Sequence, residues 1–260
     1  LVLEQLPLIK SSQILLEPNR RNTAPCIAYA LNRIKAINPE ASMIVAPADH
    51  LILKEIEFLN AIERGLNFVA ETQNLLTLGI QPNRPETGYG YIQISDQAIG
   101  DFKKVKTFTE KPELSLAKKF FDSGDFVWNS GLFIWGVQAF LKAFHKYLPE
   151  MAEIFDDAEN KIASPEEKEA IRTVYAQVKS ISIDYGIMEK ADNVHVALGD
   201  FGWSDLGTWG SLYDLSPKDI NKNVVLKCQS LLYDSKDNII ALPPDKLAVI
   251  EGLEGYLIAE

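Results

Sequence analysis

Two aspartates stand where the chain could hold a metal ion. Asp49 follows the apolar run 43–45, so it lies just past the carboxyl end of a predicted strand, where ligands bind in open α/β sheets. Asp205 lies in the run 201–209, which places two tryptophans and two glycines around one carboxylate. Mg²⁺ takes oxygen ligands, usually one or two carboxylates together with substrate phosphates. The alternatives are a helix-capping loop residue for Asp49 and an aromatic-rich turn around Asp205.

A second group of residues could bind a phosphorylated sugar. Glu110 and Lys111 end a predicted strand, where the lysine could hold a phosphate and the glutamate could accept hydrogen bonds from hydroxyl groups. Asn129 places an amide in a strand of large apolar residues, and that amide needs a partner, which is either substrate or backbone. Gly90 belongs to a stretch (87–91) that is either a close-approach loop or a hairpin turn. For the Glu110-Lys111 pair, the alternative is a solvated surface.

Glu17 is placed to recognise a purine base. A carboxylate at a strand end can accept two parallel hydrogen bonds from the N1–H and 2-amino groups of guanine, whereas adenine presents no such pair of donors. The polar run 19–23, which contains Asn22, opens a predicted helix beside Glu17 and offers amides and cations to a nucleotide. The alternative is a surface ion pair between Glu17 and Arg20 or Arg21, which contributes little stability.

The elements that must position these residues alternate between strands and helices, which is typical of an α/β domain with a largely parallel sheet. The apolar patterns predict strands over 13–17, 42–46, 75–80, 91–94, 105–109, 127–135, 181–183 and 195–198. They predict four helices. The first has Thr23 as its N-cap, the second includes 59–69, and the other two span 138–160 and 165–179. Residues 223–260 show short strand-like pieces separated by turns, so we predict a main domain over 1–222 and the start of a small all-β region over 223–260.

Composition and charge exclude several classes of protein. The net charge of −10 argues against binding to nucleic acids, although a small anionic nucleotide can still be held by local cations, amides and a metal. No stretch approaches the roughly 20 apolar residues that a membrane span requires, so we expect no membrane partner. Cys26 and Cys228 form neither a disulfide framework nor a metal-ligand pattern, which favours a cytoplasmic location.

Six motifs, taken in order along nearly the whole chain, resemble those of mannose-1-phosphate guanylyltransferases. They are Glu17-Pro18 with Arg21-Asn22-Thr23-Ala24-Pro25, Pro47-Ala48-Asp49-His50, Gly88-Tyr89-Gly90-Tyr91-Ile92, Phe108 through Glu110-Lys111-Pro112, Trp128-Asn129-Ser130-Gly131, and Trp203-Ser204-Asp205-Leu206-Gly207-Thr208-Trp209. The resemblance implies a Rossmann-like, glycosyltransferase-A-like nucleotidyltransferase with a mixed, mainly parallel sheet. It also implies that GTP and α-D-mannose 1-phosphate react, with Mg²⁺ as cofactor, to give GDP-mannose and pyrophosphate.

The resemblance further implies a role for each candidate residue. It implies that Asp49 and Asp205 bind Mg²⁺ and that Lys111 contacts the sugar phosphate. It implies that Glu110, Asn129 and the Gly90 backbone bind mannose, and that Glu17 and Asn22 face the guanine. Asp49, Lys111 and Asp205 would serve catalysis by positioning the substrates and neutralising charge, without a protein nucleophile. A homodimer through the β-rich region is also implied.

One departure from the family pattern bears on activity. Members of that family begin with a strand and a Gly-Gly-x-Gly-x-Arg loop that holds the triphosphate, and residues 1–260 contain no such loop. We therefore expect the intact protein to be active and these residues alone to be inactive. The alternatives are another sugar-1-phosphate nucleotidyltransferase, or a non-catalytic relative that binds sugar nucleotides.

Overall fold

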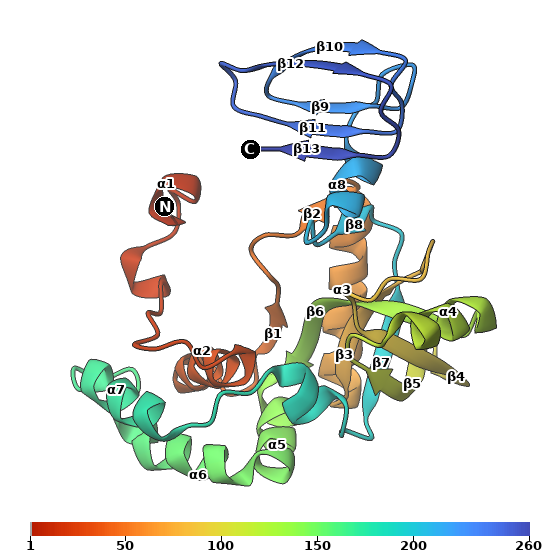
Figure 1. Ribbon diagram of the computed structural model, residues 1–260. Coiled ribbons are helices and arrows are strands. Elements are labelled where there is room, and N and C mark those ends of the chain that lie inside the picture. Colours follow the sequence, from red (N-terminus) through yellow and green to blue (C-terminus); the bar gives the residue numbers. More distant parts are fainter. Residues whose placement is uncertain (1) are drawn as a thin grey trace. The chain divides into compact units, whose positions relative to one another are not determined.

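A mixed sheet of six strands forms the centre of the first of two compact units, which comprises the chain up to Ala48 and from Ile52 to Gly202 (Figure 1). The computed structural model describes residues 2–260. The strands are β1 (Ser42–Val45), β3 (Leu75–Ile80), β4 (Tyr91–Ile99), β5 (Phe102–Thr109), β6 (Phe126–Gly136) and β7 (Val194–Leu198). Their order is β1-β6-β3-β7-β5-β4, and β4 also pairs with β6.

The directions of the strands confirm the mixed sheet that the sequence predicted. β3 and β7 pair in parallel, whereas β6 runs antiparallel to β1, β3 and β4, and β5 runs antiparallel to β4 and β7. It follows that β1, β3, β4 and β7 share one direction and that β5 and β6 oppose them. The predicted strands 42–46, 75–80 and 195–198 correspond to β1, β3 and β7.

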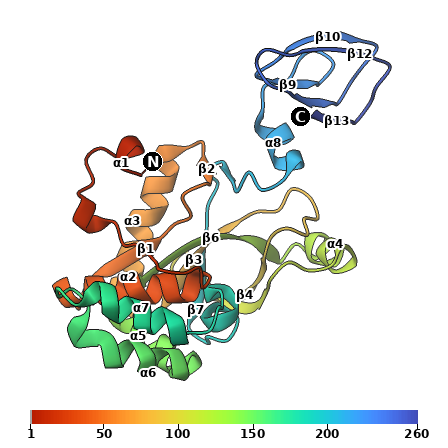
Figure 2. The same cartoon turned by 60° about the vertical axis from the view of Figure 1, so that its left-hand side comes forward.

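Helices cover both faces of this sheet (Figures 1 and 2). Helix α3 (Glu55–Thr72) packs closely on one face, because a Cβ atom at Gly65 would lie 2.6 Å from Cδ1 of Ile134 and 2.9 Å from Cδ2 of Leu76. The next residues along the same strands, Leu75 and Trp135, point into the larger core on the other face. The helices of that layer are α2 (Thr23–Ile37), α5 (Val137–Tyr147), α6 (Pro149–Ala158) and α7 (Glu167–Gln177). The short helices α1 (Val2–Gln5) and α4 (Leu114–Ser123) complete the unit.

Three predictions of local structure were wrong. The helix predicted over 138–160 is two helices, because Pro149 has no N–H to donate and begins α6 as its first residue. The segment 13–17 is not a strand, since Leu16 is 79% exposed and the chain there follows a short 3₁₀ turn (Ser11–Gln13). The segment 181–183 is not a strand either, because the backbone of Ile181 bonds to the loop at Arg21 and Ala24.

The second unit comprises Asp49–Leu51 and the chain from Trp203 to Glu260. Its strands β9 (Val224–Leu226), β11 (Ile239–Ala241) and β13 (Leu257–Ala259) pair in parallel, as do β10 (Gln229–Tyr233) and β12 (Leu247–Glu251). These parallel strands confirm the all-β character predicted for 223–260. The unit begins before residue 223 because helix α8 (Trp209–Leu215) belongs to it, and the Tyr213 hydroxyl of that helix hydrogen-bonds to Asp237. Across residues 2–260, no helix is both long and apolar enough to cross a membrane.

Candidate active site

Gly90, Glu110 and Asn129 come together at one place in the first unit. Gly90 immediately precedes β4, Glu110 immediately follows β5, and Asn129 lies in β6, so the pairing of these strands brings them side by side. The backbone N–H of Asn129 donates to the carbonyl of Gly90 at 2.8 Å. A Cβ atom at Gly90 would lie 2.5 Å from Oε2 of Glu110 and 3.3 Å from Cβ of Asn129, so a larger residue would displace the Glu110 carboxylate from this position. The close-approach interpretation of the glycine stretch therefore applies at Gly90.

The side chain of Asn129 is held in one orientation by the protein. Its Oδ1 accepts hydrogen bonds from the backbone N–H of Gly131 and from the Thr77 hydroxyl, each at 3.2 Å. A backbone N–H can only donate, so the amide nitrogen must point the other way, and it donates to Oδ1 of Asp184 at 3.0 Å. Among residues 2–260 the second amide hydrogen of Asn129 has no acceptor, so it can serve a ligand.

Asp184 is a site residue that sequence reasoning missed. It begins a short π-helix (Asp184–Met188), an element that often occurs at functional sites. Burial, and next the negative charge of Glu110, raise the pKa of Asp184 to about 6. The hydrogen bond from its own backbone N–H, the bond from Asn129 and the charge of Lys111 act in the opposite direction. The signal in the sequence was a single carboxylate between the apolar residues Ile183 and Ile187.

Lys111 leaves strand β5 through an unusual backbone conformation. Its φ angle is 45°, in the left-handed region, and the next residue is Pro112. A non-glycine residue costs about 1–3 kcal/mol there, and such residues cluster at ligand sites. The ammonium lies 3.0 Å from Oε1 of Glu110, whose hydrogen bond and charge raise the pKa of Lys111. Because 63% of this side chain is exposed, the remaining N–H groups can reach a phosphate.

Glu17 is held by helix α7 and not by an arginine. Its Oε1 accepts a hydrogen bond from the hydroxyl of the buried Tyr175 at 2.7 Å. Partial burial, and next the charge of Glu17, raise the pKa of Cys26 to about 11, so the thiol lies beside this carboxylate although Cys26 as a whole residue is exposed. Arg21 donates instead to the backbone carbonyl of Tyr175, and no arginine within residues 2–260 forms an ion pair with Glu17. The surface ion pair was therefore the wrong alternative, and the guanine role of Glu17 stays a prediction.

Asn22 follows Glu17 by five positions and directly precedes helix α2. Its Oδ1 accepts from the backbone N–H of Thr23 at 2.9 Å, so Asn22, and not Thr23 as predicted, is the N-cap. The Thr23 hydroxyl accepts from the backbone N–H of Ile183 at 2.8 Å, which ties this loop to the residue before Asp184. The amide nitrogen of Asn22 is left for a nucleotide, and that role also stays a prediction.

Asp49 and Asp205 belong to the second unit, and both lie near the imidazole of His50. His50 accepts a hydrogen bond at Nδ1 from the indole N–H of Trp203 at 3.0 Å, so its proton is on Nε2. Burial lowers the pKa of His50, while the charges of Asp49 and Asp205 both act to raise it, which places both carboxylates near this ring. Trp209 is 45% exposed, so its indole does not seal the Asp205 loop from solvent.

The loop after Asp205 holds that carboxylate in place. Oδ1 accepts from the backbone N–H of Gly207 at 2.9 Å, and a Cβ atom at Gly207 would lie 2.8 Å from Oδ2. Leu206 adopts a φ of 52°, and Thr208 then caps helix α8 by accepting from the N–H of Ser211. The carboxylate is therefore fixed by a glycine, a strained residue and a helix cap.

The donors of this pair fit magnesium better than a closed metal centre. Within residues 2–260, no group of three or more histidine, cysteine, aspartate or glutamate side chains is arranged to hold a metal. Mg²⁺ needs only one or two carboxylates, since water and substrate phosphates complete its shell. Asp49 and Asp205 could supply that number of ligands, and their metal role stays a prediction.

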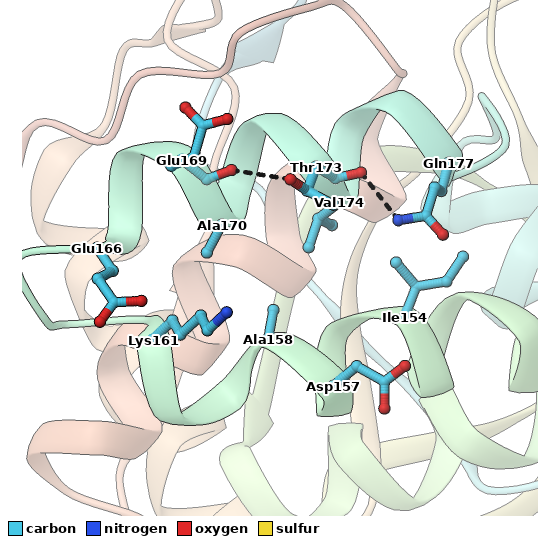
Figure 3. Close-up of a pocket in the computed structure, with 10 residues that line it drawn as sticks. All are labelled: Ile154, Asp157, Ala158, Lys161, Glu166, Glu169, Ala170, Thr173, Val174 and Gln177. Carbon is cyan, nitrogen blue, oxygen red and sulfur yellow. Dashed lines mark hydrogen bonds between the residues drawn. The ribbon is translucent and has the colours of Figure 1, made fainter.

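A groove between α6 and α7, with a volume of about 340 Å³, contains none of the predicted residues (Figure 3). Thr173 and Gln177 on its wall bond to backbone carbonyls of their own helix, as the dashed lines show. These contacts give no sign of a ligand, so the candidate site is the one around Asn129 and not this groove.

Residues 3–222 match the family model described as nucleotidyl transferase, so the chain belongs to the nucleotidyl transferase family. It is 35% identical to an Escherichia coli protein named mannose-1-phosphate guanylyltransferase, over 95% of this chain and 56% of that protein. It is 38% identical to a Salmonella muenchen protein of the same name, over 100% of this chain and 57% of that protein. These relatives confirm the resemblance found in the motifs, and the chain spans about half of their length.

Solved structures agree with this assignment of the fold. A Thermus thermophilus crystal structure, described as mannose-1-phosphate geranyltransferase, superposes with a TM-score of 0.81 at 31% identity, covering 95% of this chain and 70% of that one. A Helicobacter pylori structure described as mannose-6-phosphate isomerase superposes with a TM-score of 0.64 at 28% identity, covering 78% of each chain. The nucleotidyltransferase fold predicted from the sequence is thus confirmed.

Proposed function

We propose that the protein containing these residues makes GDP-mannose and pyrophosphate from GTP and α-D-mannose 1-phosphate. An oxygen of the sugar phosphate forms a bond to the α-phosphorus of GTP. The bond from that phosphorus to the bridging oxygen breaks, and pyrophosphate leaves. The observation that carries the proposal is the convergence of Gly90, Glu110, Lys111 and Asn129, in a chain that resembles proteins named for this reaction.

The residues of the first unit have complementary roles in this proposal. Lys111 holds the sugar phosphate, Glu110 accepts hydrogen bonds from sugar hydroxyls, and Asn129 donates its remaining amide hydrogen. Glu17 reads the N1–H and 2-amino edge of guanine, with its position set by the Tyr175 hydroxyl. Binding of this kind accelerates the reaction mainly by positioning the two substrates.

Asp49 and Asp205 would hold Mg²⁺, which when bound neutralises charge on the triphosphate. In the full-length protein, Asp205→Asn should lower turnover by ~100-fold or more, since a neutral amide is a poor magnesium ligand. Asp245→Asn, at an exposed position of the same unit, is the matched control and should leave turnover unchanged. Equal turnover in the two variants would remove Asp205 from the metal site.

The preference for one nucleotide and one sugar phosphate is tested by comparing the products formed from different substrate pairs. The full-length protein is supplied with mannose 1-phosphate or glucose 1-phosphate and with GTP, ATP, UTP or dTTP, and the sugar nucleotide formed is measured. We expect GTP and mannose 1-phosphate to be the preferred pair, and Glu17→Gln to reduce the preference for GTP. A preference for UTP or dTTP, or for glucose 1-phosphate, would replace this proposal by that of another pyrophosphorylase.

Two broader expectations complete the proposal. A cytoplasmic location follows from the cysteine usage, and both cysteines are free thiols. A homodimer follows from the family resemblance, and light scattering on the full-length protein at several concentrations tests it. A monomeric mass at all concentrations would exclude the dimer.

A further inference from the structure

The carboxylate of Asp184 borders the proposed sugar site and lies outside the six motifs identified in the sequence. Its Oδ1 accepts from the Asn129 amide at 3.0 Å. Its charge acts on Lys111, and the charge of Glu110 acts on it in turn. Asp184 therefore lies within the group of residues that the proposed function assigns to the sugar phosphate.

A purely structural role does not account for a carboxylate at this position. Holding the Asn129 amide requires one acceptor oxygen, which an uncharged side chain could also supply. A partly buried carboxylate next to Glu110 is unfavourable for the fold, and Lys111 is already hydrogen-bonded to Glu110. Glu189 adds a third carboxylate nearby, since the charge of Glu110 acts on it as well. The charge of Asp184 thus needs another explanation.

The donors and acceptors around Asp184 suit a polyhydroxyl ligand. Across residues 2–260, no side chain donates a hydrogen bond to its second oxygen, Oδ2, and the other donor to this carboxylate is the backbone N–H of Asp184 itself, which leaves acceptor capacity for a ligand. Glu110 contributes acceptors directly over Gly90, and Asn129 retains one N–H donor. Each hydroxyl of a pyranose donates one hydrogen bond and accepts others, so neighbouring hydroxyls match an alternation of carboxylates and amide.

We propose that Asp184 binds the sugar, with Oδ2 accepting a hydrogen bond from one of its hydroxyl groups. The proposal rests on the proposed function, and it adds a residue that determines which sugar fits. A hydrogen bond to a charged acceptor is stronger than one to a neutral group, so the loss of this hydroxyl should weaken binding markedly.

A cycle of ligand and protein changes tests the contact. The affinity of the full-length protein for mannose 1-phosphate and its 2-, 3-, 4- and 6-deoxy analogues is measured by calorimetry, for the wild type, Asp184→Asn and Asp192→Asn. The wild type should bind one analogue about 10- to 100-fold more weakly than mannose 1-phosphate. Asp184→Asn should lose most of that discrimination for the same analogue, whereas the exposed Asp192 variant should keep it. The affinity for GTP should not change in either variant.

The outcomes separate this inference from the proposed function. If the wild type and Asp184→Asn lose affinity by the same factor for every deoxy analogue, relative to mannose 1-phosphate, Asp184 does not touch a hydroxyl and the inference is overturned. If the wild type prefers another sugar phosphate, the proposed function fails, and the same cycle on that sugar still decides the role of Asp184. Asp184→Ser keeps an acceptor for the Asn129 amide without the charge, and it replaces Asp184→Asn in the cycle should the latter fail to fold.

Discussion

Replacing Asp184 by asparagine should stabilise the first unit, and it should do so more at high pH than at low pH. Burial and the charge of Glu110 raise the pKa of Asp184 from its ordinary value of 3.8 to about 6. The folded protein therefore binds this proton more tightly than the unfolded chain does. Wild-type stability falls as pH rises through the window between these two values, and the loss is complete above about pH 6.

The size of the effect follows from the same two values. At 1.36 kcal/mol for each pKa unit, the ionised Asp184 costs the folded state about 3 kcal/mol well above pH 6. Near pH 4.5 the cost is about 1 kcal/mol, since the folded protein is still protonated there. The ionisable groups that face this carboxyl are Glu110, which opposes its charge, and Lys111, which favours it. The charge of Tyr185, the next residue, acts on the pKa of Lys111 and raises it.

Urea unfolding of the full-length protein near pH 4.5 and near pH 8 checks this prediction, with Asp192→Asn as the exposed control. Because the chain has two units, hydrogen exchange of amides in β3 and β6 should be followed, so that unfolding of the first unit is seen by itself. The gain from Asp184→Asn over the wild type should be about 2 kcal/mol larger at the higher pH. A loss of stability that is the same at both pH values would refute the reasoning and make Asp184 a structural residue.

Three further substitutions or reactions test the surroundings of the two substrates. Gly90→Ala places a Cβ 2.5 Å from Glu110, so it should weaken calorimetric binding of mannose 1-phosphate by about 10-fold and destabilise the unit by about 1–3 kcal/mol. Tyr175→Phe removes the hydroxyl that bonds to Glu17, so it should raise the KM for GTP, leave that for mannose 1-phosphate unchanged, and lower the free energy of unfolding by about 1 kcal/mol. The pKa of about 11 for Cys26 predicts alkylation near pH 8 at a rate about 10- to 100-fold below that of an ordinary thiol, because its thiolate is rarer although more nucleophilic, and peptide mapping of the Glu17→Gln variant should show a faster reaction.

The sequence correctly predicted several strands of the sheet and site residues that lie in these strands or at their ends. Strands such as 42–46 and 75–80 were found because buried apolar runs have few alternatives. Gly90, Glu110 and Asn129 lie together for the same reason, since each adjoins or occupies a strand of one sheet. Their proximity did not follow from their spacing along the chain, and the family resemblance was needed to group them before the structure was known.

The errors arose where tertiary contacts decide the conformation of a short apolar segment. Segment 181–183 has the composition of a strand, but the backbone of Ile181 bonds to the loop at residues 21–24 and the chain then enters the π-helix. That helix carries Asp184, so the wrong prediction of a strand also concealed a site residue. A lone carboxylate in an apolar segment could have flagged it, because a buried charge requires a partner.

Several departures from ordinary folding rules coincide at the sugar site. Lys111 has a φ of 45°, Gly90 allows the Glu110 carboxylate to approach where a Cβ atom would displace it, and Asp184 holds a charge beside that same carboxylate. Each lowers the stability of the fold and each would be removed by a more conventional residue. A scaffold alone gives no reason to keep three such features within one set of contacts, whereas a ligand that supplies hydroxyl donors and a phosphate relieves the repulsion between Glu110 and Asp184 and occupies Lys111. Bound sugar phosphate should therefore stabilise the wild type more than Asp184→Asn, because only the wild type has this repulsion to relieve.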